Sequence, residues 1–149
     1  MATTLLHPDF KEFLRLLDSR QVDYLLIGGY AVGYHGYTRA TADMDIWVAI
    51  HPGNAEKLVA VIREFGFGVE ALSAELFLKE NNVVRMGVPP FRIEVLTTIS
   101  GVHFEECHQA RIADTLDGVP VKIINLGHLK LNKKARGRLK DLADLENLP

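Results

Sequence analysis

Cysteine is almost absent from this chain, which carries only Cys107. A lone cysteine cannot form an internal disulfide, so a packed core must stabilise the fold, and the missing cysteine framework indicates a reducing compartment. The residues around Cys107 also lack the glycine pattern of a nucleophile elbow. We therefore interpret Cys107 as an ordinary half-buried residue rather than as a catalytic thiol.

Long hydrophobic runs and an excess of charge of one sign are missing as well. No stretch approaches the roughly 20 apolar residues that span a bilayer. The first residues carry charges from Asp9 onward, unlike the uninterrupted apolar region of a signal peptide. The formal net charge is −2, so contact with a nucleic acid would need a local basic patch. We expect a cytoplasmic protein that makes no membrane contact.

The rest of the composition is typical of a folded domain. Hydrophobic residues make up 48% of the 149 residues, which is enough apolar material for one core. The length leaves little room for a second core. We expect one domain over residues 1–149.

Hydrophobic spacing predicts helices interspersed with strands. We expect helices at residues 8–19, 54–65, 73–80, 126–135 and 139–148, with a short one after Gly29. We expect strands at residues 22–28, 43–50, 83–88, 91–97, 110–115 and 119–124. Asp117-Gly118 predicts a hairpin turn, and Asn125 is placed to cap the helix after it. The order predicts an α/β (α+β) fold, a small mixed twisted sheet flanked by helices, with residues 126–148 packed on it.

Acidic side chains interrupt two of the apolar strands. Asp43 and Asp45 are two residues apart, so on a strand they point to the same face and repel each other. A divalent cation such as Mg²⁺ removes that repulsion and accepts oxygen ligands. Glu94 lies between Ile93 and Val95, where a carboxylate needs a partner. An Asp-x-Asp pair alone is equally typical of a surface loop, so the prediction of a metal site depends on the third acid.

A glycine pair precedes the acids. Gly28-Gly29 ends one strand and opens a helix, which lets backbone N–H groups approach an anion closely. Many turns contain two glycines, so the pair alone is weak. The ordered set of strand, glycine pair, Asp-x-Asp strand and later strand acid is more specific. It indicates a triphosphate bound beside a metal.

This ordered set resembles the nucleotidyltransferase superfamily that includes DNA polymerase β, and within it the minimal bacterial group related to AbiEii-type toxin nucleotidyltransferases. Three stretches carry the resemblance: GGYAVGYHGYTRATADMDI (28–46), RIEVLTTISGVHFEE (92–106) and LGHLKLNKKARGRLKDLADLENL (126–148). The resemblance implies transfer of a nucleoside monophosphate from an NTP to a hydroxyl acceptor with Mg²⁺ or Mn²⁺. Toxin relatives would modify tRNA or protein, and a cognate toxin or antitoxin would then be a partner.

The resemblance also implies roles for individual residues. It assigns metal binding and catalysis to Asp43, Asp45 and Glu94. It assigns nucleotide phosphates to Gly28 and Gly29, and it matches Lys133 and Asp141 to a later Lys and Asp of the bacterial group, which take part in nucleotide binding or catalysis. Two positions depart from the pattern: Tyr30 stands where polymerase-like members carry Ser, and Glu94 stands where many relatives carry Asp.

Other residues near these motifs have more than one interpretation. Arg39 precedes the Asp-x-Asp strand and either contacts a phosphate or lies on the surface. Lys133 belongs to a basic run over residues 130–140, which would ordinarily be a solvated face. Asp141 is equally suited to a cap or an ion pair with Lys140 or Arg138. Trp47 shares the face of the aspartate pair, where core packing is favoured over stacking on a base.

Two other kinds of function fit parts of the pattern. One is a non-catalytic nucleotide-binding module, such as an antitoxin or regulatory protein, although such a module has no need of three metal-binding acids. The other is an interaction protein whose basic C-terminal helix docks on nucleic acid.

Overall fold

The computed structural model of the protein describes residues 5–149. Its frame is a six-stranded sheet in the order β3-β4-β2-β1-β6-β5. β2 pairs antiparallel with β1 and parallel with β4, so the sheet is mixed and the predicted fold class is confirmed. The strands are β1 (Tyr24–Ile27), β2 (Met44–Val48), β3 (Val83–Met86), β4 (Ile93–Leu96), β5 (Ile112–Leu116) and β6 (Val119–Ile123).

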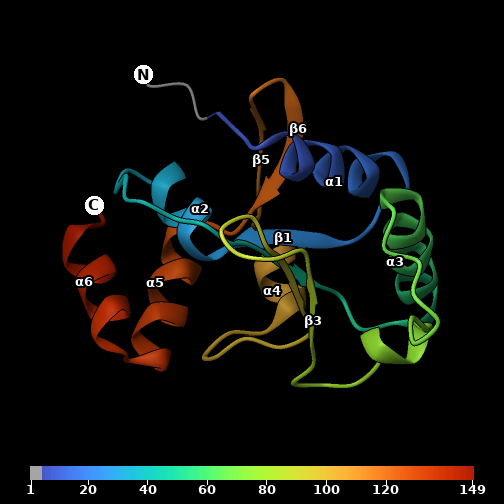
Figure 1. The fold of residues 1–149 in the computed structure, drawn as a ribbon. Helices are drawn as coiled ribbons and strands as arrows, with labels where there is room; N and C mark the ends of the chain where they lie inside the picture. Colours follow the sequence, from blue (N-terminus) through green and yellow to red (C-terminus); the bar gives the residue numbers. More distant parts are fainter. Residues whose placement is uncertain (1–4) are drawn as a thin grey trace.

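Helices lie on either side of this frame. Figure 1 shows α1 and α3 on the right of the strands and the pair α5–α6 on the left. No helix among residues 5–149 is long and apolar enough to cross a bilayer. The helices are α1 (Pro8–Ser19), α2 (Gly28–Tyr34), α3 (Pro52–Phe65), α4 (Phe104–Gln109), α5 (Leu126–Arg136) and α6 (Leu139–Asn147), with a 3₁₀ helix, η1, at Ala74–Phe77.

The core lies against the centre of the sheet. Every residue of β1 is buried, because this strand has neighbours on both edges and helices over it. α1 turns its apolar stripe inward, and Phe13 meets Phe65 of α3 edge to face with ring centroids 5.2 Å apart. Trp47 is buried as predicted, and its indole N–H donates to the Thr97 carbonyl at 3.3 Å.

Local chemistry sets the element ends. Asp117 and Gly118 both have positive φ, 49° and 79°, as a two-residue type I′ hairpin requires. The Asn125 side chain accepts a hydrogen bond from the His128 N–H at 2.8 Å, which caps α5 as predicted. Gly137 ends α5 in the left-handed conformation at φ 63°, and α6 starts two residues later.

Four sequence expectations need correction. The helix expected at residues 73–80 is only the four-residue 3₁₀ helix η1. The α3 helix begins at Pro52 rather than at residue 54, because the His51 side chain caps it and proline suits the first helical position. The short helix α4 was not predicted. It turns Cys107 into the core, so this cysteine is fully buried rather than half-buried. Burial and the nearby Glu106 raise the pKa of the Cys107 thiol to about 11, which keeps it protonated at neutral pH.

Candidate active site

The pairing of β2 with β4 brings two of the predicted acids together. In this parallel pair Asp45 lies directly opposite Glu94. Residues opposite each other on adjacent strands share a face of the sheet. Asp43 immediately precedes β2 and lies two residues before Asp45, so its side chain joins the same face. We call Asp43, Asp45 and Glu94 the strand acids.

A cavity of about 630 Å³ opens over the strand acids. Its wall includes the glycine pair, Arg39 and Lys133, so residues from four separate stretches of the chain meet at one place. Beyond these, the cavity is lined by basic side chains from β3, from the residue before β4 and from the end of α5 to the start of α6: Arg85, Arg92, Arg136, Arg138 and Lys140. Basic side chains around the strand acids suit a polyanionic ligand.

Neighbouring side chains leave no room for a Cβ atom at either residue of the glycine pair. Gly28 has φ +66°, and a Cβ there would overlap the carboxylate of Asp45. A Cβ on Gly29 would overlap the hydroxyl of Thr41. Both positions therefore keep open the approach between the end of β1 and the start of β2. The α2 helix that the pair opens has only 7 residues, so the backbone N–H groups matter here more than a long helix dipole.

Asp45 is the least compensated of the strand acids. Burial, then the charges of Glu94 and Asp43, raise the pKa of Asp45 to about 6. Its Oδ1 atom is buried and has no hydrogen-bond partner. A buried carboxylate oxygen without a donor, beside two further carboxylates, is a donor set that suits a hard divalent cation.

Arginine side chains occupy part of this site. Arg92 Nη2 lies 3.0 Å from Asp43 Oδ2 and 3.1 Å from Glu94 Oε1. Arg85 Nε lies 3.2 Å from the same Glu94 oxygen. Among residues 5–149, no three His, Cys, Asp or Glu side chains are already arranged as a metal cage. The strand acids thus have the right chemistry for a cation, with a guanidinium between two of them.

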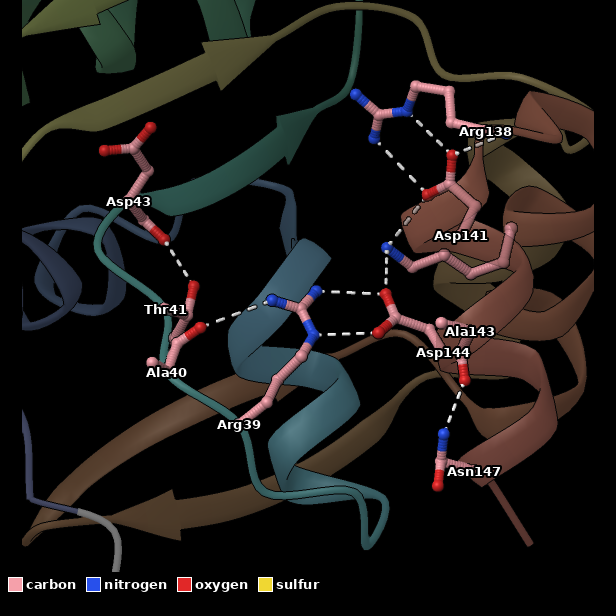
Figure 2. Close-up of polar contacts among 10 residues, drawn as sticks. Arg39, Ala40, Thr41, Asp43, Arg138, Asp141, Ala143, Asp144 and Asn147 are labelled. Carbon is pink, nitrogen blue, oxygen red and sulfur yellow. Dashed lines mark hydrogen bonds and ion pairs between the residues drawn. The ribbon is translucent and has the colours of Figure 1, made fainter.

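A second group of charges lies beside the cavity, on the C-terminal helices. Lys133 of α5 is 2% exposed, and its Nζ lies 3.4 Å from Asp141 and 3.1 Å from Asp144 on α6. Arg39 and Arg138 complete the group, which we call the helix cluster. Figure 2 shows Arg39 reaching from the segment before β2 to Asp144, with the Asp43 carboxylate well apart from these contacts.

Each acid of the helix cluster has two cationic partners. Arg39 donates through Nε and Nη2 to both oxygens of Asp144, at 2.8 and 3.0 Å. Arg138 donates to both oxygens of Asp141, at 2.7 and 3.3 Å. Burial alone would raise the pKa of Asp141, but Arg138 and then Lys133 hold it at about 2. Burial is likewise outweighed by Arg39 and Lys133 at Asp144, whose pKa is lowered.

The structure therefore brings most of the predicted site residues to one cavity. Asp141 is the exception: it is fully buried behind Lys133 and is not part of the cavity wall. The predicted alternative of an ion pair with Arg138 is confirmed for it. The sequence interpretation overlooked Arg85, Arg92 and Asp144 as site residues. Two signals in the sequence could have identified two of them. Arg92 alternates with Glu94 and so shares its face of the strand, and Asp144 lies three residues after Asp141 and so shares its face of the helix.

Comparison with known proteins supports the fold. No family model matches the chain, and no curated protein matches its sequence. Solved structures similar to the chain include two proteins named for nucleotidyltransferases. One is a Thermotoga maritima protein that bears the name of a nucleotidyltransferase, with TM-score 0.64, 13% identity, and 95% of this chain and 93% of the other covered. The other is an antigenic nucleotidyltransferase-like protein from Paracoccidioides brasiliensis, with TM-score 0.53, 19% identity, and 95% and 76% covered.

These likenesses establish a nucleotidyltransferase fold. Substrate, metal dependence and the AbiEii-type subgroup stay predictions.

Proposed function

We propose that this protein is a metal-dependent nucleotidyltransferase that transfers a nucleoside monophosphate from an NTP to a hydroxyl acceptor. The observation that supports it most directly is the register of β2 and β4, which sets Asp45 opposite Glu94 beside Asp43. Three carboxylates share one face, and one of them has a buried oxygen without a hydrogen-bond partner. This arrangement costs free energy unless a cation binds between them.

The strand acids would hold Mg²⁺ or Mn²⁺. When bound, such an ion lowers the pKa of an attacking hydroxyl and neutralises charge on the phosphates. The backbone N–H groups of Gly28 and Gly29 would face the phosphates, since both glycines line the cavity and neither tolerates a side chain. Arg39 and Lys133 line the same cavity and add positive charge near the triphosphate.

The helix cluster would position these two cations rather than react. Asp144 holds Arg39 by two hydrogen bonds, and Asp141 and Asp144 together hold Lys133. A cation already fixed by carboxylates loses little further freedom when a ligand arrives. Asp141, assigned to catalysis by resemblance, thus acts through Lys133 in this proposal, because its carboxylate does not reach the cavity.

The acceptor and the biological setting belong to the proposal as well. RNA and protein hydroxyls both suit a cleft with a basic rim, and a toxin–antitoxin role follows only from the resemblance.

The test is a labelling reaction. Purified protein is incubated with each α-³²P-labelled NTP, with Mg²⁺ or Mn²⁺, and with total cellular RNA or protein, and pyrophosphate release is measured in parallel. We expect label in one acceptor fraction, and a loss of about 100-fold or more in Asp45→Asn and in Glu94→Gln, because the charge that holds the metal is gone.

Asp18→Asn is the matched control, since Asp18 lies on the exposed end of α1 away from the cavity. Full activity in both site variants would refute the proposed site. Metal-dependent nucleotide binding without pyrophosphate release would instead favour the non-catalytic nucleotide-binding module.

A further inference from the structure

Arg92 holds the strand acids in an arrangement that a metal ion must change. A single nitrogen, Nη2, bridges Asp43 Oδ2 at 3.0 Å and Glu94 Oε1 at 3.1 Å. This positive group therefore occupies the space between two of the three carboxylates to which the proposed function assigns the metal. An ion that binds all three acids must take over these oxygens from the guanidinium.

The way Arg92 makes this contact differs from the other arginines of the site. Arg39 and Arg138 each use Nε and Nη2 to grip both oxygens of one carboxylate, which is the strongest and most specific form of this pair. Arg92 uses one nitrogen for two acids, and its Nε is buried without a partner. While it bridges the two acids, the guanidinium of Arg92 keeps N–H donors unused. It can therefore bind a further anion through them.

We propose that Arg92 couples metal binding to triphosphate binding: its guanidinium competes with a free divalent cation for Asp43 and Glu94, and transfers to the triphosphate when metal and nucleotide bind together. This inference rests on the proposed function. It adds that the protein binds the metal–triphosphate complex far better than it binds metal alone.

The coupling follows from the charges that share the cavity. Without a triphosphate, a cation that displaces Arg92 leaves the guanidinium unpaired among other basic groups, which costs free energy. With a triphosphate present, the displaced group finds an anion in the same cavity. Arg85 contacts Glu94 but not Asp43, so it resists the metal at only one acid and cannot replace Arg92 as a bridge.

Calorimetry of the full chain tests the coupling. Wild type, Arg92→Gln and Arg92→Lys are each titrated with Mn²⁺ alone and with the preformed Mn²⁺–tripolyphosphate complex. We expect Arg92→Gln to bind Mn²⁺ alone about tenfold more tightly than wild type, because the competing charge is gone. We expect the same variant to bind the complex no more tightly than wild type, so that the preference for the complex falls. Arg92→Lys keeps a cation near the acids and should stay close to wild type for Mn²⁺ alone.

Arg63→Gln, on the last turn of α3 and outside the cavity, is the control and should match wild type in both titrations. Mn²⁺ binding by Arg92→Gln that is no tighter than by wild type would overturn the coupling while leaving the metal site intact. The double variant Asp45→Asn/Arg92→Gln separates the two claims, because retained Mn²⁺ binding there would refute the metal site itself. If no variant binds Mn²⁺ in either form, the coupling and the proposed function fail together.

Discussion

The strand acids and the helix cluster are neighbouring groups of charge that are built in opposite ways. In the helix cluster each carboxylate is matched by two cations, and the arginines grip their partners through two nitrogens. Among the strand acids, one arginine bridges two carboxylates and the third has a buried oxygen without a donor. Every carboxylate of the helix cluster thus has cationic partners, whereas the strand acids carry more negative charge than their partners neutralise.

The pKa values of the buried acids express the same difference. Burial and the charges of Glu94 and Asp43 raise the pKa of Asp45 to about 6, and Arg136 and Lys133 offset this only in part. At Asp141, Arg138 and Lys133 overcome burial and hold the pKa at about 2. Balanced buried charge is typical of a structural support, and unbalanced buried charge is typical of a site that binds something. On the proposed function, the comparison separates the residues that would position the site from the residues that would bind its ligands.

The largest expected effect comes from breaking the helix cluster. Asp144→Ala removes the partner of Arg39 and one of the two partners of Lys133, leaving a buried ammonium poorly compensated. We expect the free energy of unfolding to fall by about 3–5 kcal/mol, as measured by urea denaturation.

Lys133→Met is the control for this change. It removes the buried positive charge but leaves each aspartate with its arginine, so we expect a loss clearly smaller than that of Asp144→Ala. Equal losses in the two variants would mean that side-chain packing, rather than charge balance, holds α6 in place.

Substitution of a strand acid should have the opposite effect and raise the stability of the metal-free protein. Because the folded pKa of Asp45 lies above its ordinary value of 3.8, the folded state binds the proton more tightly than the unfolded state does. Metal-free protein should therefore lose stability as the pH rises from about 4 to about 6, and Asp45→Asn should remove that loss. At pH 8, with EDTA present, we expect the variant to be more stable than wild type by about 1–2 kcal/mol.

Thermal and urea unfolding of both proteins at pH 4, 6 and 8 measures this effect, with Asp18→Asn as the exposed control. A destabilised Asp45→Asn at pH 8 would show that Asp45 has a structural partner, and the contrast between the two groups would then be lost.

The two groups also differ in how well the sequence predicts them. Alternation along DMDIWV and FRIEVLT is local information, and it suffices to set Asp45 and Glu94 on strands, each on the face opposite its apolar neighbours. The glycine pair and the hairpin at Asp117-Gly118 were likewise predictable, because each needs a backbone conformation that few residues adopt. The fold class followed from the order of these elements.

The partners of those residues were not predictable in the same way. The contact of Arg39 with Asp144 joins residues 105 positions apart, and no spacing rule reveals it. Lys133 lies in a run of basic residues whose ordinary place is the surface, and only the packing of α5 against α6 buries it. Helix α4 has 6 residues and too little periodicity to be recognised, which is why the depth of Cys107 was misjudged.

The smallest expected effect is that of Arg85→Gln, and the comparison for it is the same substitution at Arg39. Arg85 pairs with Glu94 through an exposed side chain, whereas Arg39 is half-buried and binds the buried Asp144. Exposed ion pairs contribute at most about 1 kcal/mol, so Arg85→Gln should change the free energy of unfolding by less than that. Arg39→Gln should cost more, about 2–3 kcal/mol, because Asp144 is buried and would lose a two-nitrogen contact. Urea denaturation of the two variants side by side measures the difference, and equal losses would contradict the division between a support and a site. If the order holds, the same substitution at two arginines of one cavity separates an exposed ion pair that contributes little to stability from a two-nitrogen contact with a buried acid that supports the fold.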